Sequence, residues 1–592
     1  MSKYFVGAAS LAVLTLPAVA LAEAASGPSQ VSEVTVTAPS SLSDLSLTPN
    51  TQVSVTADAL ARTVSVLTPE DTLRYLPNIL VRQRHVGDTQ APVTTRTSGV
   101  GASARSLIFV DGMLISALIG NNNTSASPKW GLVTPDAVAR VDVLYGPFSA
   151  QYAGNSLGAV LAYTTRMPTK LEAEADVQGA LQSFSKYRDS GDYSTARVAG
   201  SIGDRFDRFA FRLSYNRLDS RAQPLTYATA TVPSSTSASG TVATGAVFDA
   251  NRISQPIAIL GSTGIEHQIQ DNASGRATFD VTPKITAAYA FGVFHNNDAS
   301  TVNSYLTGAA GAPVYAGALN IAGRAYTVAN SAFSGGVYHT DELELSNGLS
   351  LASHTGGVFD FDIVATTFDY LHSRQRVPSG ALPAAFTGGP GSSSALDGTG
   401  WYTLDASGTW RPGGMGGAHV VSFGAHQDGF RLNSPRYGLI DWIGGSDAPV
   451  QSTSRGVTQT QALWAQDVWT LAPQLKATIG GRWESWLAGN GLNYSATPAL
   501  NVSQPHEASN AFSPKGVLAW TPLPGWTFKG SVGVAYRFPT VSELYQSVTV
   551  GALLQTPNPN LTPERALSSE LSAEKAFEAS CGWLTLRAGV AE

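Results

Sequence analysis

The sequence has little cysteine and little charge. Its 592 residues include one cysteine, Cys581, which excludes an intrachain disulfide and a cysteine-based metal cluster. Asp, Glu, Lys and Arg together make up 14% of the chain, whereas soluble proteins carry about 25%. The formal net charge is −6 and no Lys/Arg-rich run is present, which argues against a nucleic acid as the partner.

Long apolar runs are also missing, except at the N-terminus. Lys3 precedes an apolar segment, residues 6–19, and an A-x-A cleavage site follows at Ala20-Leu21-Ala22. This pattern predicts a secretory signal peptide over residues 1–22. No later stretch reaches the ~18 apolar residues of a transmembrane helix. A membrane location would therefore require a closed β-barrel, because only helices and closed barrels satisfy every backbone polar group in lipid.

Glycine is abundant, with 58 residues, and three of them fall in the stretch VDVLYGPFSAQYAGNSLGAV, residues 141–160. A Gly-rich loop that follows a strand can bind phosphate. However, Gly146, Gly154 and Gly158 match neither GxGxxG nor GxxxxGK[ST]. A nucleotide-binding loop is therefore excluded.

The remaining chain divides into three regions. Residues 23–61 are rich in Ser, Thr, Pro and Ala and predict a flexible leader, which contains the β-capable peptide VSEVTVTA at residues 31–38. Residues 62–168 predict a compact α+β domain with a short helix that ends at Pro77. Residues 169–592 alternate between apolar and polar positions in segments of about 9 to 11 residues, the length of a tilted transmembrane strand.

The alternation separates two kinds of face. In the segment 209–216, one face of the strand carries Phe209, Phe211, Leu213 and Tyr215. The opposite face carries Ala210, Arg212, Ser214 and Asn216. One face suits lipid and the other a wet lumen. The connections also differ, since 282–283 and 523–525 predict tight turns, whereas 225–275 and 380–400 predict long loops. Short turns at one end and long loops at the other are typical of an outer-membrane barrel.

Several quoted segments occur in the order of a known family's motifs. VSEVTVTA is similar to a TonB box, and ASARSLIFVDG followed by VDVLYGPFSAQYAGNSLGAVLAYTTRMP is similar to a plug-domain signature. ALWAQDVWTLAPQLKATIGGRWES resembles barrel strands, and AYRFPTVSELYQ with PNPNLTPERALSSEL resembles late-barrel motifs. The chain thus resembles the TonB-dependent outer-membrane receptors. The resemblance implies a membrane all-β fold, a large antiparallel transmembrane β-barrel of about 22 strands with an N-terminal α+β plug domain in its lumen.

In such a plug the glycines have a structural role. A plug folds inside a lumen, so its backbone has to pass close to neighbouring strands. Gly146, Gly154 and Gly158 would permit tight turning and close approach, because they carry no side chain.

The resemblance implies an importer rather than an enzyme, in the outer membrane of a Gram-negative bacterium. TonB, with its inner-membrane energising complex, would bind the TonB box as an added strand, through Glu33, Val34, Thr35, Val36, Thr37 and Ala38. The ligand would bind apical plug loops at 82–88, 99–105 and 118–127. The candidate ligand contacts in these loops are Arg84, His85, Ser103, Arg105, Asn121, Asn122 and Asn123. The alternatives are lumen salt bridges for the arginines and a turn for the asparagines.

The substrate implied first is a ferric siderophore, while vitamin, saccharide and other metal-complex receptors share the same motifs. Residues 539–557 contain no His, which argues against the haem-receptor branch. We expect no cofactor, no protein-bound metal, no nucleic acid, and a monomer in outer-membrane lipid. A passive porin-like channel or a surface adhesin is the alternative from another class. A barrel-embedded protease is disfavoured, because no compact Asp/His or Ser/His cluster is evident.

The C-terminal region predicts a shortfall of strands. Only a short stretch follows Leu561 in the last motif, and the sequence ends in TLRAGVAE rather than in an aromatic residue. We therefore expect the barrel, residues 169–592, to be incomplete at its C-terminus and unable to close. An open sheet would leave backbone groups facing lipid, each at a cost of several kcal/mol.

Overall fold

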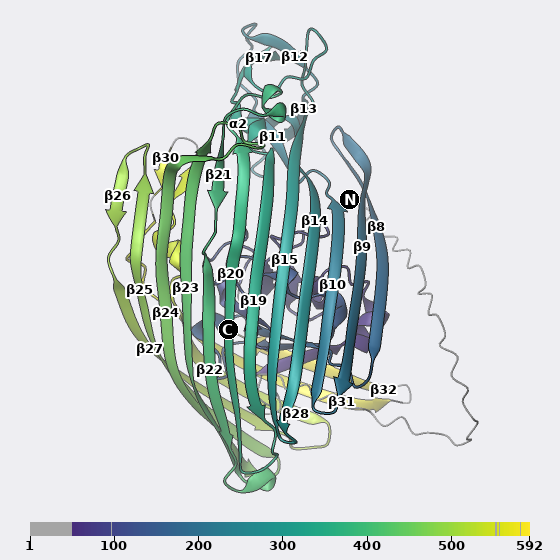
Figure 1. Ribbon diagram of the computed structural model, residues 1–592, viewed down its shortest axis with the longest axis vertical. Helices are drawn as coiled ribbons and strands as arrows, with labels where there is room; N and C mark the ends of the chain where they lie inside the picture. Colours follow the sequence, from purple (N-terminus) through teal and green to yellow (C-terminus); the bar gives the residue numbers. More distant parts are fainter. Residues whose placement is uncertain (1–49, 96–97, 551–552, 556, 580–581, 592) are drawn as a thin grey trace, which may run out of the picture.

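The computed structural model describes residues 50–95, 98–550, 553–555, 557–579 and 582–591. Long strands form a barrel around a smaller mixed sheet, which is drawn in purple inside the barrel in Figure 1. Within the described residues no helix has the length and apolar character needed to cross a membrane. The peptide at residues 31–38 lies outside the described residues.

The inner sheet is the plug. Its strands have the order β1-β6-β7-β4-β5, with β4 and β7 parallel and the other neighbours antiparallel. The bounds are β1 (Thr51–Thr56), α1 (Ala57–Thr63), β4 (Ser106–Val110), β5 (Met113–Leu114), β6 (Val138–Tyr145) and β7 (Ala159–Thr165), with a separate pair β2 (Ile79–Val81) and β3 (Val93–Thr95). β7 is buried on both faces over its whole length, which places it at the centre of the plug core.

Ordered structure begins upstream of residue 62, the predicted start of this domain. β1 and most of α1 lie within the stretch predicted as a flexible leader, and β1 is ordered because Val53 and Val55 pack on the plug core. The Ser- and Thr-rich composition around β1 hides its short alternation. The helix predicted before Pro77 is a 3-10 helix, Pro69–Leu73.

The Gly-rich stretch connects β6 to β7. Gly146 has a φ of +74°, a conformation that glycine adopts without steric cost. Gly154 lies against barrel strand β28 (Trp526–Arg537), so that a Cβ built on it would overlap the carbonyl oxygen of Tyr536. A Cβ on Gly158 would overlap the hydroxyl of Thr95. The predicted structural role of these glycines, close backbone approach, is confirmed.

The barrel wall is one antiparallel sheet. Its long strands are β8 (Glu172–Lys186), β9 (Asp189–Phe206), β10 (Phe209–Arg221), β14 (Pro256–Thr282), β15 (Ile285–Ser304), β19 (Tyr338–Ser353), β20 (Phe359–Pro378), β22 (Gly400–Trp410), β23 (His419–Leu439), β24 (Asp447–Ala472), β25 (Leu475–Ser495), β27 (Glu507–Trp520), β28, β31 (Glu564–Ala579) and β32 (Gly582–Ala591). In β10, Leu213 and Tyr215 are 46% and 47% exposed, whereas Ala210 and Arg212 are 0% and 3% exposed. This is the predicted alternation, with an apolar face outward and a more polar face inward.

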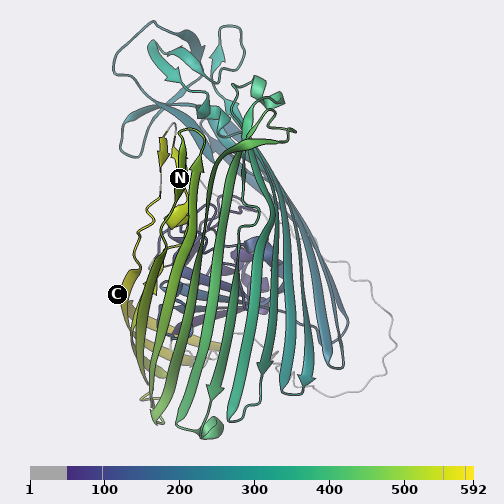
Figure 2. The same cartoon turned by 60° about the vertical axis from the view of Figure 1, so that its left-hand side comes forward.

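The two ends of the barrel differ. At the turn end, connections are short, as at residues 207–208, 283–284 and 473–474. At the loop end, which is at the top of Figure 2, the connections are long. They carry β11 (Thr226–Thr231), β12 (Thr241–Thr244), β13 (Val247–Ala250), β16 (Thr307–Gly308), β17 (Gly317–Ile321), β18 (Arg324–Val328), α2 (Ser331–Ser334), β21 (Gly391–Ala395), β26 (Leu500–Ser503), α3 (Val541–Tyr545), β29 (Val548–Val550) and β30 (Leu553–Gln555).

One predicted loop, 225–275, is shorter than expected because β14 begins at Pro256. The inward positions of β14 are polar, and its outward positions include His267 and Asp271 as well as Ile265 and Ile269. An alternation with polar residues on both faces gives only a weak strand signal.

The order of the strands is that of a closed barrel, with β32 next to β8. This order contradicts the prediction that the chain cannot close its barrel. The residue pairings among the described residues run without a break from β8 to β32. In Figure 1, β31 and β32 run more obliquely behind the plug than β19 and β20 do in front of it. A strongly tilted strand covers more of the circumference, so fewer strands than expected can surround the plug.

Candidate ligand-binding site

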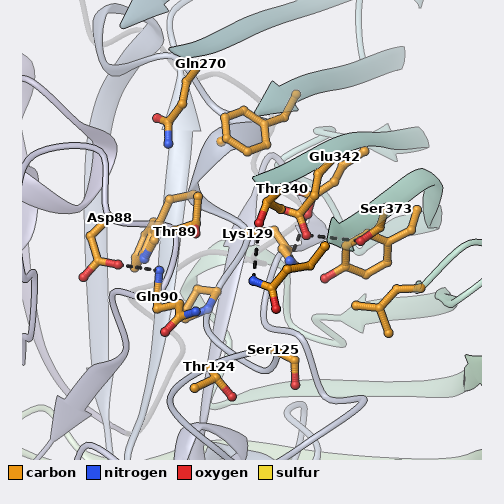
Figure 3. Close-up of a pocket in the computed structure, with 18 of the residues that line it drawn as sticks. Asp88, Thr89, Gln90, Thr124, Ser125, Lys129, Gln270, Thr340, Glu342 and Ser373 are labelled. Atoms are coloured by element: carbon orange, nitrogen blue, oxygen red, sulfur yellow. Dashed lines mark hydrogen bonds and ion pairs between the residues drawn. The ribbon is translucent and has the colours of Figure 1, made fainter. Parts of the chain in front are cut away.

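A cavity of about 470 Å³ lies between the plug and the wall, toward the loop end (Figure 3). The plug contributes residues from 67–70, 87–90 and 124–135. The wall contributes side chains of β10, β14, β15, β19, β20, β23 and β24. A volume of this size is within the range of small-molecule sites, ~300–1,000 Å³.

Lys129 of the plug is a buried cation in this lining. Its Nζ lies 2.9 Å from Oε1 of Glu344 on β19 and 4.5 Å from the centroid of the Tyr370 ring on β20. Burial alone would lower the pKa of Lys129, but Glu344 and Tyr370 outweigh burial and raise the pKa above its usual range. Lys129 therefore stays charged, and Glu344 neutralises it.

Two plug carboxyl groups line the cavity in different protonation states. Burial would raise the pKa of Asp88, but hydrogen bonds from the Arg84 guanidinium, at 2.9 and 2.6 Å, hold it below its usual range. Glu70 is 3% exposed, and burial together with the charge of Asp71 raises the pKa of Glu70 to about 8. At neutral pH, Asp88 is thus ionised and paired, whereas Glu70 is mostly uncharged.

Most of the other polar groups in the lining are hydroxyls and amides. In Figure 3 the labelled members of this set are Thr89, Gln90, Thr124, Ser125, Gln270, Thr340 and Ser373. Ser373 donates to Oε1 of Glu342 at 3.2 Å, and Gln270 donates to the carbonyl oxygen of Gly87 at 2.7 Å. The first of these bonds lies within the wall, between β20 and β19, whereas the second holds a plug loop at the edge of the cavity.

The first predicted apical loop, 82–88, reaches the cavity through Gly87 and Asp88 rather than through Arg84 and His85. The Arg84 side chain is paired with Asp88. The His85 side chain is 2% exposed, and its Nε2 lies 2.8 Å from Oε2 of Glu266 on β14. His85 thus ties the plug to the wall and does not line the cavity.

The second and third predicted loops meet α3 and β31. Asn121 accepts a hydrogen bond from the N–H of Ala104 at 3.1 Å and donates to Oε1 of Glu543 on α3 at 3.1 Å. Arg105 donates to Oε2 of Glu564 at 2.8 Å. Both predicted residues are therefore used to join the plug to the barrel.

Arg537, at the end of β28, connects these groups. It donates to both carboxylate oxygens of Glu543, at 2.8 and 3.1 Å, and to Oε1 of Glu564 at 2.7 Å. Burial would raise the pKa of Glu543, but Arg537 holds it below its usual range. We call Arg105, Asn121, Arg537, Glu543 and Glu564 the α3 network. It fixes the two loops in place from the barrel side.

None of the remaining predicted contacts, Ser103, Asn122 and Asn123, lines the cavity. Oδ1 of Asn122 accepts from the N–H of Thr124 at 2.9 Å, which is the turn expected as an alternative. Asn123 is half-buried in the same segment, and Ser103 lies in a 3-10 helix with its hydroxyl buried. Their neighbours Thr124 and Ser125 line the cavity instead.

Sequence reasoning misses the wall residues of the site. The main ones are Gln270, Thr340, Glu342, Glu344, Tyr370 and Ser373. A signal existed, because several polar residues occupy the inward positions of their strands. The same signal occurs along the whole wall, so it cannot locate the cavity. In the part of the chain that the structure describes, no three His, Cys, Asp or Glu residues are placed to hold a metal ion.

A folded plug inside an antiparallel barrel with an apolar outer face defines the class of plugged outer-membrane barrels. The family model "TonB-dependent Receptor Plug Domain" matches residues 44–160, and the model "TonB dependent receptor-like, beta-barrel" matches residues 289–590. The chain belongs to the TonB-dependent receptor family. Its location is the outer membrane of a Gram-negative bacterium.

Named relatives agree with this membership. The iron-regulated outer membrane virulence protein of Vibrio cholerae serotype O1 is 28% identical over 162 residues, which cover 26% of this chain and 20% of that protein. The match thus spans a fifth of the relative's length. The ferric citrate transporter FecA in the unliganded form has a TM-score of 0.62 at 14% identity, over 92% of this chain and 69% of its own.

A second solved structure, the ferric yersiniabactin uptake receptor FyuA from Yersinia pestis, has a TM-score of 0.56 at 13% identity. The match covers 92% of this chain and 72% of FyuA. At such identities the likeness of the solved structures shows the fold alone.

Proposed function

We propose that this protein imports a scarce ligand, a ferric siderophore in the first place, across the outer membrane with energy supplied through TonB. The observation that carries the proposal is the cavity of about 470 Å³ between plug and wall, toward the loop end. FecA is a ferric citrate transporter and FyuA a ferric yersiniabactin uptake receptor, which supports iron as the cargo. Vitamin, saccharide and other metal-complex uptake are the alternatives within the same mechanism.

Passage through this barrel requires work on the plug. The plug core and the wall share one hydrophobic cluster, in which Val143 and Leu161 of the plug belong together with Phe368, Trp401 and Trp486 of the wall. A plug packed in this way disfavours a passive porin, because cargo can pass only if the packing is rearranged. We propose that TonB supplies this work by pairing with residues 33–38 as an added strand.

Within this proposal the predicted apical residues have positioning roles. Thr89, Gln90, Thr124 and Ser125 meet the ligand from the plug side. Arg84, His85, Arg105, Asn121 and Asn122 hold the loops that present them, and Ser103 and Asn123 lie in the same loops. Loss of one of these positioning contacts should weaken ligand binding less than loss of a residue that lines the cavity.

Deletion of residues 31–38 tests the proposal. Cells that carry the deletion should bind a radio-labelled ferric chelate at their surface as the wild type does, but should not accumulate it. Deletion of the equally long segment 39–46 from the same leader is the matched control and should leave uptake intact. Uptake that survives both the deletion of 31–38 and a protonophore would support a porin, and surface binding without uptake by the wild type would support an adhesin.

A further inference from the structure

The charges around the cavity are nearly all compensated. Its lining contains four carboxyl groups and two cations, namely Glu70, Asp88, Glu342, Glu344, Lys129 and Arg436. Lys129 is paired with Glu344, and Asp88 with Arg84 behind the lining. Neither pair offers a net charge to a ligand.

The two other charged side chains, Glu342 and Arg436, lie at different depths. Glu342 is half-buried on β19 and accepts from Ser373 (Figure 3). Arg436 is exposed on β23, and its Nη2 donates to Oγ of Ser392 at 2.9 Å. Among the described lining residues there is thus no cluster of unpaired cations, and an exposed arginine is the sole cation without a carboxylate partner.

This charge pattern discriminates between ligands. An anionic ligand that enters the cavity loses water, and a buried charge is tolerated only when it is paired. It would also face Glu342, whose charge has no cation partner in the lining and repels an anion. Hydroxyl and amide groups, which make up most of the polar lining, instead match the carbonyl and hydroxyl groups of an uncharged ligand.

On the basis of the proposed function, we propose that the cargo is an uncharged, oxygen-rich ligand and that ferric chelates of net negative charge are rejected. Three monoanionic hydroxamates neutralise a ferric ion, whereas three dianionic catecholates leave a trianion. A ferric tris-hydroxamate therefore fits the cavity and a ferric tris-catecholate does not. A neutral oligosaccharide presents the same oxygen chemistry and forms a separate arm of the test.

The test is a binding titration of the full-length protein in detergent micelles at low ionic strength. The probes are a ferric tris-hydroxamate, a ferric tris-catecholate and a neutral oligosaccharide. Binding of each probe is measured by calorimetry and by tryptophan fluorescence. The tris-hydroxamate should bind at least ~10-fold more tightly than the tris-catecholate, because like charges across a site lower affinity. Added salt should reduce this ratio, since it screens the repulsion.

Two substitutions that each remove one negative charge sharpen the test. Glu342→Gln keeps the shape of the side chain and its acceptor for Ser373, and should raise tris-catecholate affinity ~10-fold while tris-hydroxamate affinity changes less than ~2-fold. Asp207→Asn is the matched control at the turn end, where φ is +50° and asparagine is tolerated. It should leave both affinities unchanged. Heat-modifiable migration verifies that each variant is folded.

The outcomes separate the inference from the proposed function. Tris-catecholate binding as tight as tris-hydroxamate binding would overturn the inference and leave siderophore uptake standing. Binding of the oligosaccharide alone would support an uncharged cargo and overturn the ferric siderophore. A folded protein that binds none of the three probes would overturn both.

Discussion

The plug meets two parts of the barrel wall in different ways. Against β28 and α3 the contact is close, since Gly154 lies on the carbonyl of Tyr536, and Leu544 and Tyr545 are fully buried in the plug core. We call this the tight side. Against β15 the plug also packs closely, since a Cβ on Gly292 would overlap the carbonyl oxygen of Leu132. Against β14 and β19, by contrast, the plug makes separate polar contacts around a cavity, for example from Lys129 to Glu344. We call this the cavity side.

The difference shows how one plug can be both held and released. Polar contacts on the cavity side can be exchanged for contacts with a ligand or with water at small net cost, because a hydrogen bond contributes only about 0.5–1.5 kcal/mol net. Close packing on the tight side cannot be replaced in this way, because an interior packed at crystal-like density has no space into which side chains can shift. We therefore expect substitutions on the tight side to be more costly, unless a charge is buried on the cavity side.

The largest effect is expected from Gly154→Ala. The new Cβ would overlap a backbone atom of β28, which cannot move without displacing the strand. We expect a loss of ~4 kcal/mol or more, seen as a loss of heat-modifiable protein from outer membranes. Gly101→Ala is the control, because a Cβ there meets nothing within 4 Å. Equal yields of the two variants would show that the tight side is not tight.

A pH dependence is expected from Glu70 on the cavity side. Burial raises its pKa from 4.5 to about 8, so the folded state favours the protonated form. The contribution of the protonated carboxyl group to the free energy of unfolding is complete below pH ~4.5. It decreases as the pH rises and is lost once the pH has passed about 8. The shift corresponds to a loss on the order of 4 kcal/mol.

Glu70→Gln removes this titration and should stabilise the protein above pH 8. Thermal unfolding between pH 4 and pH 9 measures the effect, and the variant curve should be flatter than the wild-type curve over this range. Asp207→Asn, on the exposed turn, provides a control in which the wild-type slope persists. If the stability of Glu70→Gln falls with pH as steeply as that of the wild type, the pH dependence arises from other groups.

The next largest loss of stability is expected from a substitution in the α3 network. The side chain of Arg537 is 5% exposed, so Glu543→Ala would leave a buried charge with only Glu564 as a partner. We expect a loss of about 3 kcal/mol, measured by thermal unfolding. The pair of Arg205 with Asp280 is 37% and 28% exposed, and Asp280→Ala should cost less than ~1 kcal/mol. Similar costs for both substitutions would contradict a special role of burial.

Features set by local pattern could be predicted from the sequence. The faces of β10 follow from the two-residue period, because successive side chains of a strand point to opposite sides. The structural role of Gly154 follows from the resemblance of its stretch to a plug-domain signature, since a plug backbone has to pass close to the strands around it. Turns and loops follow from short Pro/Gly signals, except where β14 has polar residues on both faces.

The site itself could not be predicted, because its contacts join distant segments. Lys129 and Glu344 are 215 residues apart in the chain, and His85 and Glu266 are 181 apart. His85 is polar and lies in an apical loop, which favoured a ligand contact. Instead, the contact with Glu266, which is distant in the sequence, holds the His85 side chain inside the protein. No local pattern contains that information.

The smallest effect is expected from Gly87→Ala on the cavity side. A Cβ there would lie 2.8 Å from Cδ2 of Leu218, the end of a flexible side chain that can move away. The φ of +86° remains unfavourable for alanine, at a cost of about 1 kcal/mol. We expect a small decrease in thermal stability with full assembly, and weaker ligand binding because Gly87 lines the cavity. Failure to assemble, as expected for Gly154→Ala, would show that the two sides are equally rigid.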